Sequence, residues 1–397
     1  MTSNASRLAI IVVLQIVGIL AGAQLGKIAP LVDWYQREVG LSLTLIGWFT
    51  SMIGIFVAAV ALPAGWAIER AGPDRTFVAG SLVLAAGGFA LSLLDAPSAV
   101  LAARLVEGAG YLVLVIATPA LLAAISPARW KAPVLAIWGG FVPIGFAVAD
   151  FSARAMLPET GPKIYLATSI AAFAVVAGLA ALLLHEEKYL EQRASGAAGN
   201  TFMATMTLPV WLTALAFGVY VVSSVGFFTF MPAYAGERDG LLLSAGAIAL
   251  AVPVGNILAG ILVRGRGLRF IVLLSGAGFL ANMALAVPGF TAADPAFATL
   301  AVVAYAIIGG LVASALFAAI PFLVPQSGSA SVAIGLVAQA GGLGTLFGPP
   351  LAGHIIENFG FGGFGMLLAA VSLIGVVVLL PLTLAKVQRD NLLQTQQ

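Results

Sequence analysis

Long apolar stretches, separated by short polar or Pro/Gly-rich breaks, follow one another along nearly the whole chain. A helix needs about 20 apolar residues to cross the ~30 Å hydrocarbon core of a bilayer. Stretches of this length predict twelve spans, near residues 8–30, 43–68, 76–95, 98–123, 133–155, 162–184, 208–234, 241–263, 268–289, 296–324, 329–357 and 361–385. A transmembrane β-barrel would instead show alternating segments of about 10 residues, and the sequence has none. The pattern predicts an all-α membrane protein with twelve transmembrane helices.

The composition supports the membrane class. Apolar residues make up 61% of the chain and charged residues 9%, against roughly 45–50% and about 25% in ordinary soluble domains. The 46 glycines and 20 prolines are tolerated in membrane helices, because neighbouring helices satisfy the freed backbone groups and small residues permit close approach. The absence of cysteine excludes disulfides, thiolate metal sites and cysteine nucleophiles.

The basic residues are distributed unevenly between the two sides of the membrane. Twelve of them fall in the termini and in the connections that follow even-numbered spans, and five fall in or beside the opposite connections. By the positive-inside rule, both termini lie in the cytoplasm. The connection after the tenth span has no basic residue. The first span lacks a small-residue cleavage site, so we expect it to be retained in a multi-pass protein of the cell inner membrane.

The longest cytoplasmic connection, residues 185–207, divides the chain into two sets of six spans. Pro30 and Pro232 end spans one and seven, and Ser42 and Ser244 begin spans two and eight at the same offset of 202 residues. Equal halves around a central loop are typical of the parallel repeats of secondary transporters. We predict two pseudo-symmetric six-helix bundles, at residues 1–184 and 208–397, joined by the linker 185–207.

Two short patterns give the chain a family resemblance. Residues 65–75 between spans two and three read GWAIERAGPDR, which resembles the loop signature Gly-x-x-x-Asp-Arg-x-Gly of the major facilitator superfamily, with Glu69 in place of the aspartate. Residues 104–110 in span four read RLVEGAG, which resembles the Arg-x-x-(Gln)-Gly-x-Gly pattern of the same family. The second-half loop, residues 260–269, keeps glycines and basic residues but has no acid. The resemblance extends over essentially the whole chain and implies the major facilitator fold.

The resemblance also implies a conformational latch that closes the cytoplasmic side in the outward-facing state, formed here by Gly65, Glu69, Arg70, Gly72 and Arg75. The carboxylate of Glu69 can pair with the neighbouring arginines, and the two glycines allow close packing and a tight turn. The alternative is a solvated basic loop with no latching role.

Ionisable side chains inside a span cost a few kcal/mol on insertion scales, so they mark functional positions. Arg104 and Glu107 lie in span four, Asp150 lies in span five, and Lys27 lies close to the outer end of span one. At about 1.5 Å per residue their depths overlap, so Arg104 can reach Glu107 on its own helix or Asp150 on the next. Either carboxylate can couple transport to protons, and Arg104 can bind an anionic solute. The alternative is a fixed salt bridge between spans four and five.

Uncharged polar side chains supply further candidates for a solute site near the midplane, several of them on spans one, seven and ten, which with span four generally line the cavity in the family that the chain resembles. The candidates are Gln15, Gln24, Tyr220, Ser223, Asn256, Tyr305 and Gln339. For any one of them, hydrogen bonding between helices is the alternative.

These features predict a secondary active transporter for a small polar or anionic organic solute, working by alternating access and coupled to protons. A proton-coupled exporter of lipophilic compounds is the alternative. No phosphate-binding Gly-rich motif is present, and the two histidines cannot form a catalytic cluster. We therefore expect no enzyme activity, cofactor, metal site or nucleic-acid partner, and a monomer surrounded by lipid. Residues 133–139 are faintly similar to carriers of small anions such as the cyanate permease group.

Overall fold

The computed structural model describes residues 4–127, 130, 134–135, 137–185, 203–237, 241–328 and 330–384. These residues form helices joined by short connections, and no strand occurs among them. Ten of the described helical segments are long and apolar enough to cross a membrane. The predicted all-α membrane architecture is confirmed.

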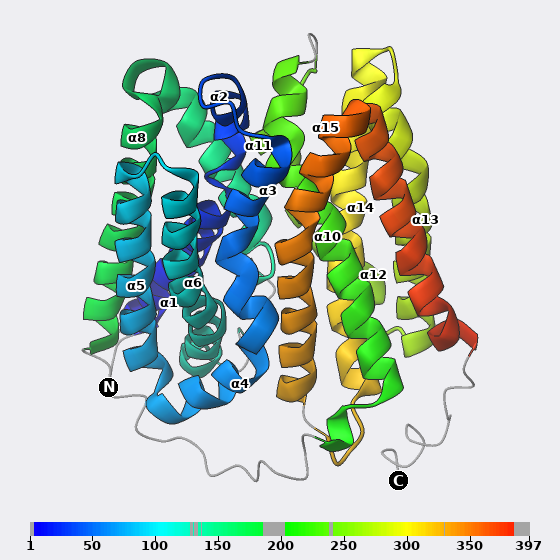
Figure 1. Ribbon diagram of the computed structural model, residues 1–397. Coiled ribbons are helices and arrows are strands. Elements are labelled where there is room, and N and C mark those ends of the chain that lie inside the picture. Colours follow the sequence, from blue (N-terminus) through cyan, green and yellow to red (C-terminus); the bar gives the residue numbers. More distant parts are fainter. Residues whose placement is uncertain are drawn as a thin grey trace.

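The first half of the chain forms the helices on one side of the molecule (Figure 1). Helix α1 (Asn4–Gly26) continues through a 3-10 turn (η1, Ala29–Leu31) into α2 (Val32–Arg37). Helix α3 (Leu43–Ser51) leads through a second 3-10 turn (η2, Met52–Gly54) into α4 (Ile55–Ala71). Helices α5 (Pro73–Leu93), α6 (Pro97–Ile125) and α8 (Phe141–His185) complete this half.

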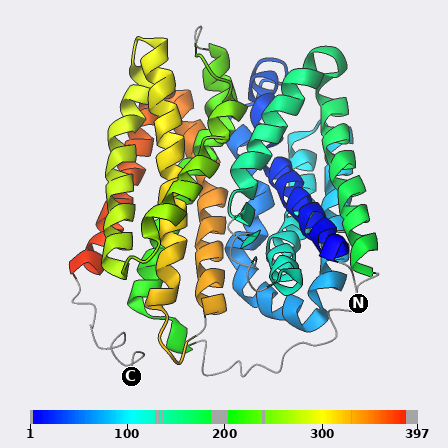
Figure 2. The same ribbon diagram turned by 180° about the vertical axis from the view of Figure 1, so that it is seen from behind.

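The second half repeats this plan on the other side (Figure 2). Helix α10 (Leu208–Glu237) is followed by the short α11 (Ala245–Ala249) and by α12 (Val252–Val263). Helices α13 (Leu268–Thr291), α14 (Pro295–Leu323) and α15 (Ala330–Leu384) follow. Ser42 and Ser244 cap α3 and α11 through side-chain oxygens that accept backbone N–H bonds, so the two serines mark equivalent helix starts.

Two of the helices are about twice the length of a span because each contains a glycine at which the chain reverses. Gly161 in α8 has φ of 75° and Gly360 in α15 has φ of 63°, a left-handed conformation that glycine adopts without steric cost. Figure 1 shows the ribbon turning back at both places. These two reversals separate predicted span five from span six, and span eleven from span twelve. The count of twelve crossings depends on them.

The two halves meet along closely packed backbones. A Cβ added to Gly47 of α3 would lie 2.5 Å from the carbonyl oxygen of Pro349 in α15, and one added to Gly342 would lie 2.5 Å from the backbone nitrogen of Ala58 in α4. Only glycine allows helices to approach this closely. The division at residues 185–207 stays a prediction, because residues 186–202 lie outside the described part of the chain.

Candidate functional site

A group of charged side chains is enclosed in the first half between α1 and α6. One carboxylate oxygen of Glu107 accepts a bond of 2.5 Å from Lys27 Nζ, and the other accepts a bond of 2.7 Å from Arg104 Nη1. All three side chains are fully buried. Gly87 and Gly88 of α5 make room for the carboxylate, because a Cβ at either would come within 3 Å of Glu107. We call Lys27, Arg104 and Glu107 the charged cluster.

Arg104 also binds backbone carbonyl groups of neighbouring helices. Its Nε donates to the Phe49 oxygen at 2.6 Å, Nη1 to the Gln24 oxygen at 2.9 Å, and Nη2 to the Thr50 oxygen at 3.2 Å. Phe49 and Thr50 lie just before the 3-10 turn η2, where the regular i to i+4 bonding of the helix changes. The guanidinium thus joins the first, second and fourth spans.

Gln24 extends the network to α8. Its side-chain oxygen accepts a bond of 2.9 Å from Lys27, and its amide nitrogen donates to the Ser169 hydroxyl at 3.1 Å. The charged cluster contains two cations and one carboxylate, so ionised forms leave one positive charge that is compensated only by neutral oxygens. In a medium of low dielectric, such an imbalance makes the energy of the cluster sensitive to the gain or loss of one proton.

The predicted reach from Arg104 to Asp150 is wrong. Asp150 instead accepts bonds of 2.9 Å from Arg154 Nε and from the backbone N–H of Gly246 at the start of α11. Depth along a span does not determine the direction in which a side chain leaves its helix, and Asp150 points away from α6 toward the second half. Asp150 is therefore a contact between the halves.

We expect Asp150→Ala to open this end of the boundary, because the variant removes a charge-assisted bond worth about 1.5–3 kcal/mol. The chain has no cysteine, so spin labels placed through Glu159→Cys and Thr291→Cys report the separation of the halves without background. Double electron–electron resonance should record a longer distance in at least about ten times more molecules than without the substitution, since about 1.4 kcal/mol corresponds to a tenfold change in population. The control is Asp294→Ala, which removes an exposed helix cap within the second half; an equal shift there would contradict the assignment.

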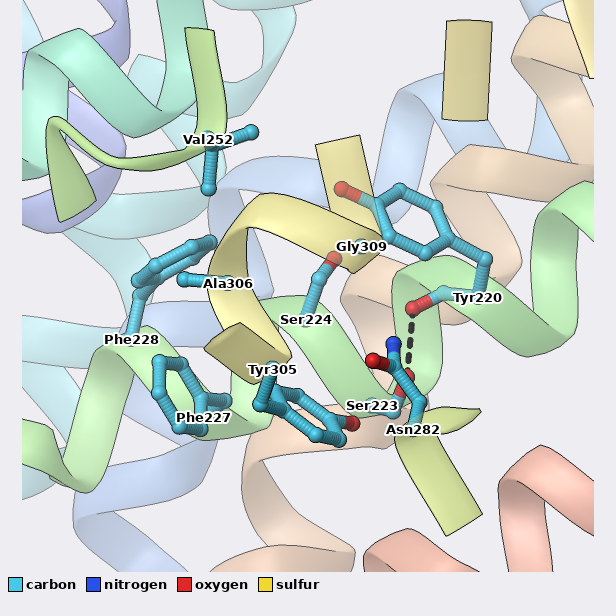
Figure 3. Close-up of a pocket in the computed structure, with 10 residues that line it drawn as sticks. All are labelled: Tyr220, Ser223, Ser224, Phe227, Phe228, Val252, Asn282, Tyr305, Ala306 and Gly309. Carbon is cyan, nitrogen blue, oxygen red and sulfur yellow. Dashed lines mark hydrogen bonds between the residues drawn. The ribbon is translucent and has the colours of Figure 1, made fainter. Parts of the chain in front are cut away.

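The second half contains a small pocket between α10, α12, α13 and α14. In this conformation the space at its centre fits about one water molecule. Figure 3 shows the residues around it, which are Tyr220, Ser223, Ser224, Phe227, Phe228, Val252, Asn282, Tyr305, Ala306 and Gly309. No charged residue is among them. We call this the neutral pocket.

Two polar atoms in the neutral pocket have no partner. The Asn282 side-chain oxygen and the Tyr305 hydroxyl are buried and make no hydrogen bond of good geometry within the described part of the chain, although the hydroxyls of Ser223 and Ser372 lie near that of Tyr305. The Ser223 hydroxyl, in contrast, donates to the Tyr220 carbonyl at 2.8 Å. The ring of Tyr305 stacks on Phe227 with 5.1 Å between centroids. The pocket thus combines aromatic walls with hydrogen-bonding groups that remain available.

The other predicted polar residues do not line this pocket. Gln15 donates to the Val134 carbonyl at 2.7 Å, and Asn256 accepts from the Ser314 hydroxyl at 3.1 Å. Gln339 donates to the Ala59 carbonyl at 3.3 Å across the boundary between the halves. These contacts fit the alternative of helix–helix hydrogen bonding. Asn282 was missed by sequence reasoning, although a single amide inside the apolar stretch 268–291 was the available signal.

The geometry of the predicted latch is found in part. Gly72 has φ of 95° and makes the expected tight turn between α4 and α5. A Cβ added at Gly65 would meet nothing within 4 Å, so the close packing expected there is absent. Arg70 lies 3.9 Å from the ring of Trp66 in a cation–π contact. The Glu69 side chain lies outside the described part of the structure, and its pairing with Arg70 or Arg75 stays a prediction.

Comparisons with known proteins give a family from one search and a fold from another. A family model for the Major Facilitator Superfamily matches residues 14–342. No curated protein matches the chain significantly. Among solved structures, the chain is similar to a bacterial homologue of the human lysosomal transporter Spinster in its inward-facing, unoccupied conformation, at 17% identity and a TM-score of 0.71 over 96% of both chains. The inward-facing, occupied conformation gives 16% identity and a TM-score of 0.73, over 96% of this chain and 95% of that one. At these identities the likeness concerns the fold alone.

Proposed function

The chain belongs to the major facilitator superfamily, and on that premise we propose that it moves a small polar or anionic organic solute across the inner membrane under the drive of a proton gradient. Membership of the family makes the protein a multi-pass secondary transporter that works by alternating access, a carrier and not an enzyme. The finer proposal adds that both termini lie in the cytoplasm and that the monomer is the working unit.

The observation that carries the proton coupling is the charged cluster. Protonation of Glu107 would leave Lys27 and Arg104 facing neutral groups only, which is costly for buried cations. The ammonium group of Lys27 would then separate from the carboxyl, or lose its own proton, and either change would loosen α1 from α6. Proton binding is thereby linked to the packing of spans that border the transport path.

Contacts between the halves would carry this change to the rest of the molecule. Toward one end of the boundary, Asp150 binds Gly246, and the Thr44 hydroxyl donates to Glu357 at 3.0 Å. Further along α15, Gln339 binds the backbone of α4. Alternating access requires these sets of contacts to open in turn.

The aromatic lining and missing charge of the neutral pocket favour a second candidate function, the proton-coupled export of lipophilic compounds. A thermal-shift screen of detergent-purified protein separates the two functions. Stabilisation by small carboxylates, inorganic anions, amino acids or sugars supports the first function, and stabilisation by lipophilic compounds alone supports the second.

The coupling is tested with the double variant Lys27→Met/Glu107→Gln, which keeps the net charge of the cluster at one while removing the titratable pair. Uptake of the stabilising solute into proteoliposomes would be measured with and without a pH gradient. We expect the double variant to retain exchange of the solute between the two sides but to lose the acceleration by the gradient. Asp95→Asn, which changes a carboxylate of an exposed ion pair inside the first half, serves as the matched control and should keep that acceleration. Full acceleration in the double variant would rule out the charged cluster as the coupling site.

A further inference from the structure

The neutral pocket occupies the place in the second half that the charged cluster occupies in the first. Helices α6 and α14 have 29 residues each and begin at Pro97 and Pro295. Counted from these prolines, Glu107 corresponds to Tyr305, since each lies ten residues on, and Arg104 corresponds to Val302. Equivalent positions of the two repeats therefore hold an ion-paired carboxylate on one side and an unpartnered phenol on the other.

The neighbouring helices show the same correspondence. Gly72 and Gly267 precede α5 and α13, and Gly87 and Asn282 each lie fifteen residues after them. In the first half the bare backbone of Gly87 packs against Glu107. In the second half the amide of Asn282 enters the space beside Tyr305 instead.

The pairing of cations is lost in the second half as well. Lys27 lies three residues before Pro30, which ends predicted span one. Thr229 lies three residues before Pro232, which ends predicted span seven. The Thr229 hydroxyl donates to the Val225 carbonyl of its own helix at 2.7 Å, so it does not reach the pocket to satisfy Tyr305. In the first half this space is filled by side chains that pair with one another, whereas the second half retains an unfilled space with free polar atoms.

Leaving two buried polar atoms unpaired costs about 1–3 kcal/mol each, so the arrangement calls for an occupant that supplies the missing hydrogen bonds. A charged group would enter this pocket without a counter-ion and would bear a large desolvation cost. The aromatic side chains of Phe227, Phe228 and Tyr220 around the pocket favour a flat apolar group once the space is enlarged.

We propose that the neutral pocket binds the transported solute, and that this solute is an uncharged molecule with an amide or hydroxyl group on a flat apolar body. The proposal rests on the proposed transport function and narrows its solute class to uncharged molecules, which excludes the anionic solutes. The Tyr305 hydroxyl and the Asn282 amide bind the polar group, while the charged cluster carries the proton and makes no contact with the solute.

The pocket has a route to the boundary between the halves. Phe228, which forms one wall, packs against Phe146 of α8 in the first half with 5.5 Å between ring centroids. When the halves separate on that side, Phe228 loses this support and is free to turn. The pocket is therefore closed in the present conformation, and movement of the halves would enlarge it.

The test uses four probes that share one ring and differ in charge, which are benzamide, benzyl alcohol, benzoate and benzylammonium. Binding to the detergent-purified full chain is measured by equilibrium dialysis at about pH 7. We expect the two neutral probes to bind, with benzoate and benzylammonium at least about tenfold weaker. Tyr305→Phe and Asn282→Leu should each weaken benzamide binding about tenfold. Tyr111→Phe, a buried tyrosine of α6 outside the pocket, is the matched control and should bind benzamide as the unchanged chain does.

A second readout separates binding from a structural role. Because Tyr305→Phe and Asn282→Leu remove unpaired buried polar atoms, the empty variants should melt at the same temperature as the unchanged protein or higher. A lower melting temperature together with unchanged benzamide binding would overturn the proposal. Equal binding of benzoate, or no binding of either neutral probe, would also overturn it. None of these outcomes depends on a proton gradient. The binding proposal can therefore fail while proton-coupled transport stands, and proton coupling can fail while the binding proposal stands.

Discussion

Replacing Glu107 with alanine is expected to destabilise the folded protein by about 3–5 kcal/mol, which is a large effect for a single substitution. Removing one partner of a buried ion pair leaves the other charge uncompensated, and in this cluster two cations, Lys27 and Arg104, lose the same partner at once. The measurement is the melting temperature in detergent together with the yield of monodisperse protein. Glu357→Ala, which removes an exposed carboxylate, is the control and should change little.

The charged cluster also allows a prediction of the direction in which a second substitution changes the stability. Glu107→Gln raises the net charge of the cluster from one to two, and adding Lys27→Met returns it to one. The double variant should therefore be more stable than Glu107→Gln alone. If the two substitutions acted independently, the second would instead lower the stability further. If the second substitution destabilises the protein further, charge balance does not control the energy of this site.

Cross-linking the two halves at one end of the boundary is expected to reduce transport to the level of empty vesicles. Thr44 and Glu357 lie opposite each other on α3 and α15, with their side chains hydrogen-bonded at 3.0 Å. Thr44→Cys and Glu357→Cys, joined by a short bifunctional thiosulfonate, would hold the ends of the halves together, and alternating access requires them to separate. Uptake into proteoliposomes is the measurement, and a reducing agent should restore it.

A pair within one half gives the matched control for cross-linking. Lys163 and Asp95 form an exposed ion pair of 2.8 Å inside the first half. Asp95→Cys with Lys163→Cys receives the same reagent, but its bridge moves with the half as a rigid body. Transport should continue in this variant. Loss of transport in both pairs would show that the reagent itself inhibits, and continued transport in both would contradict movement at the boundary.

Span positions and helix caps were predictable from the sequence because they depend on local patterns. The twelve apolar stretches, the serines that cap α3 and α11, and the i,i+3 pair of Arg104 with Glu107 all follow from residues close together in the chain. Helices α8 and α15 each contain two predicted spans, one on either side of a glycine reversal, so the backbone shows fewer helices than there are predicted spans.

Contacts between distant segments were less predictable. The bond from Lys27 to Glu107 depends on how α1 crosses α6, and the bond from Asp150 to Gly246 depends on the rotation of α8 about its axis. Hydropathy gives the depth of a residue but not this rotation. The neutral pocket was only partly anticipated for the same reason, because Asn282 becomes significant only when α13 places it beside Tyr305.

The partners of Arg104 have a consequence for how the protein is made. Every group that binds this guanidinium outside its own helix, the carbonyls of Gln24, Phe49 and Thr50, lies earlier in the chain. An arginine costs about 2.5–3.5 kcal/mol at the centre of an isolated helix when the translocon passes it into lipid, and less toward a helix end; Arg104 lies in the first third of α6. Since synthesis proceeds from the N-terminus, spans one and two are already in the membrane when span four leaves the ribosome. The carbonyl groups that bind Arg104 are thus already in the membrane when span four is inserted, and they lower the cost of its insertion.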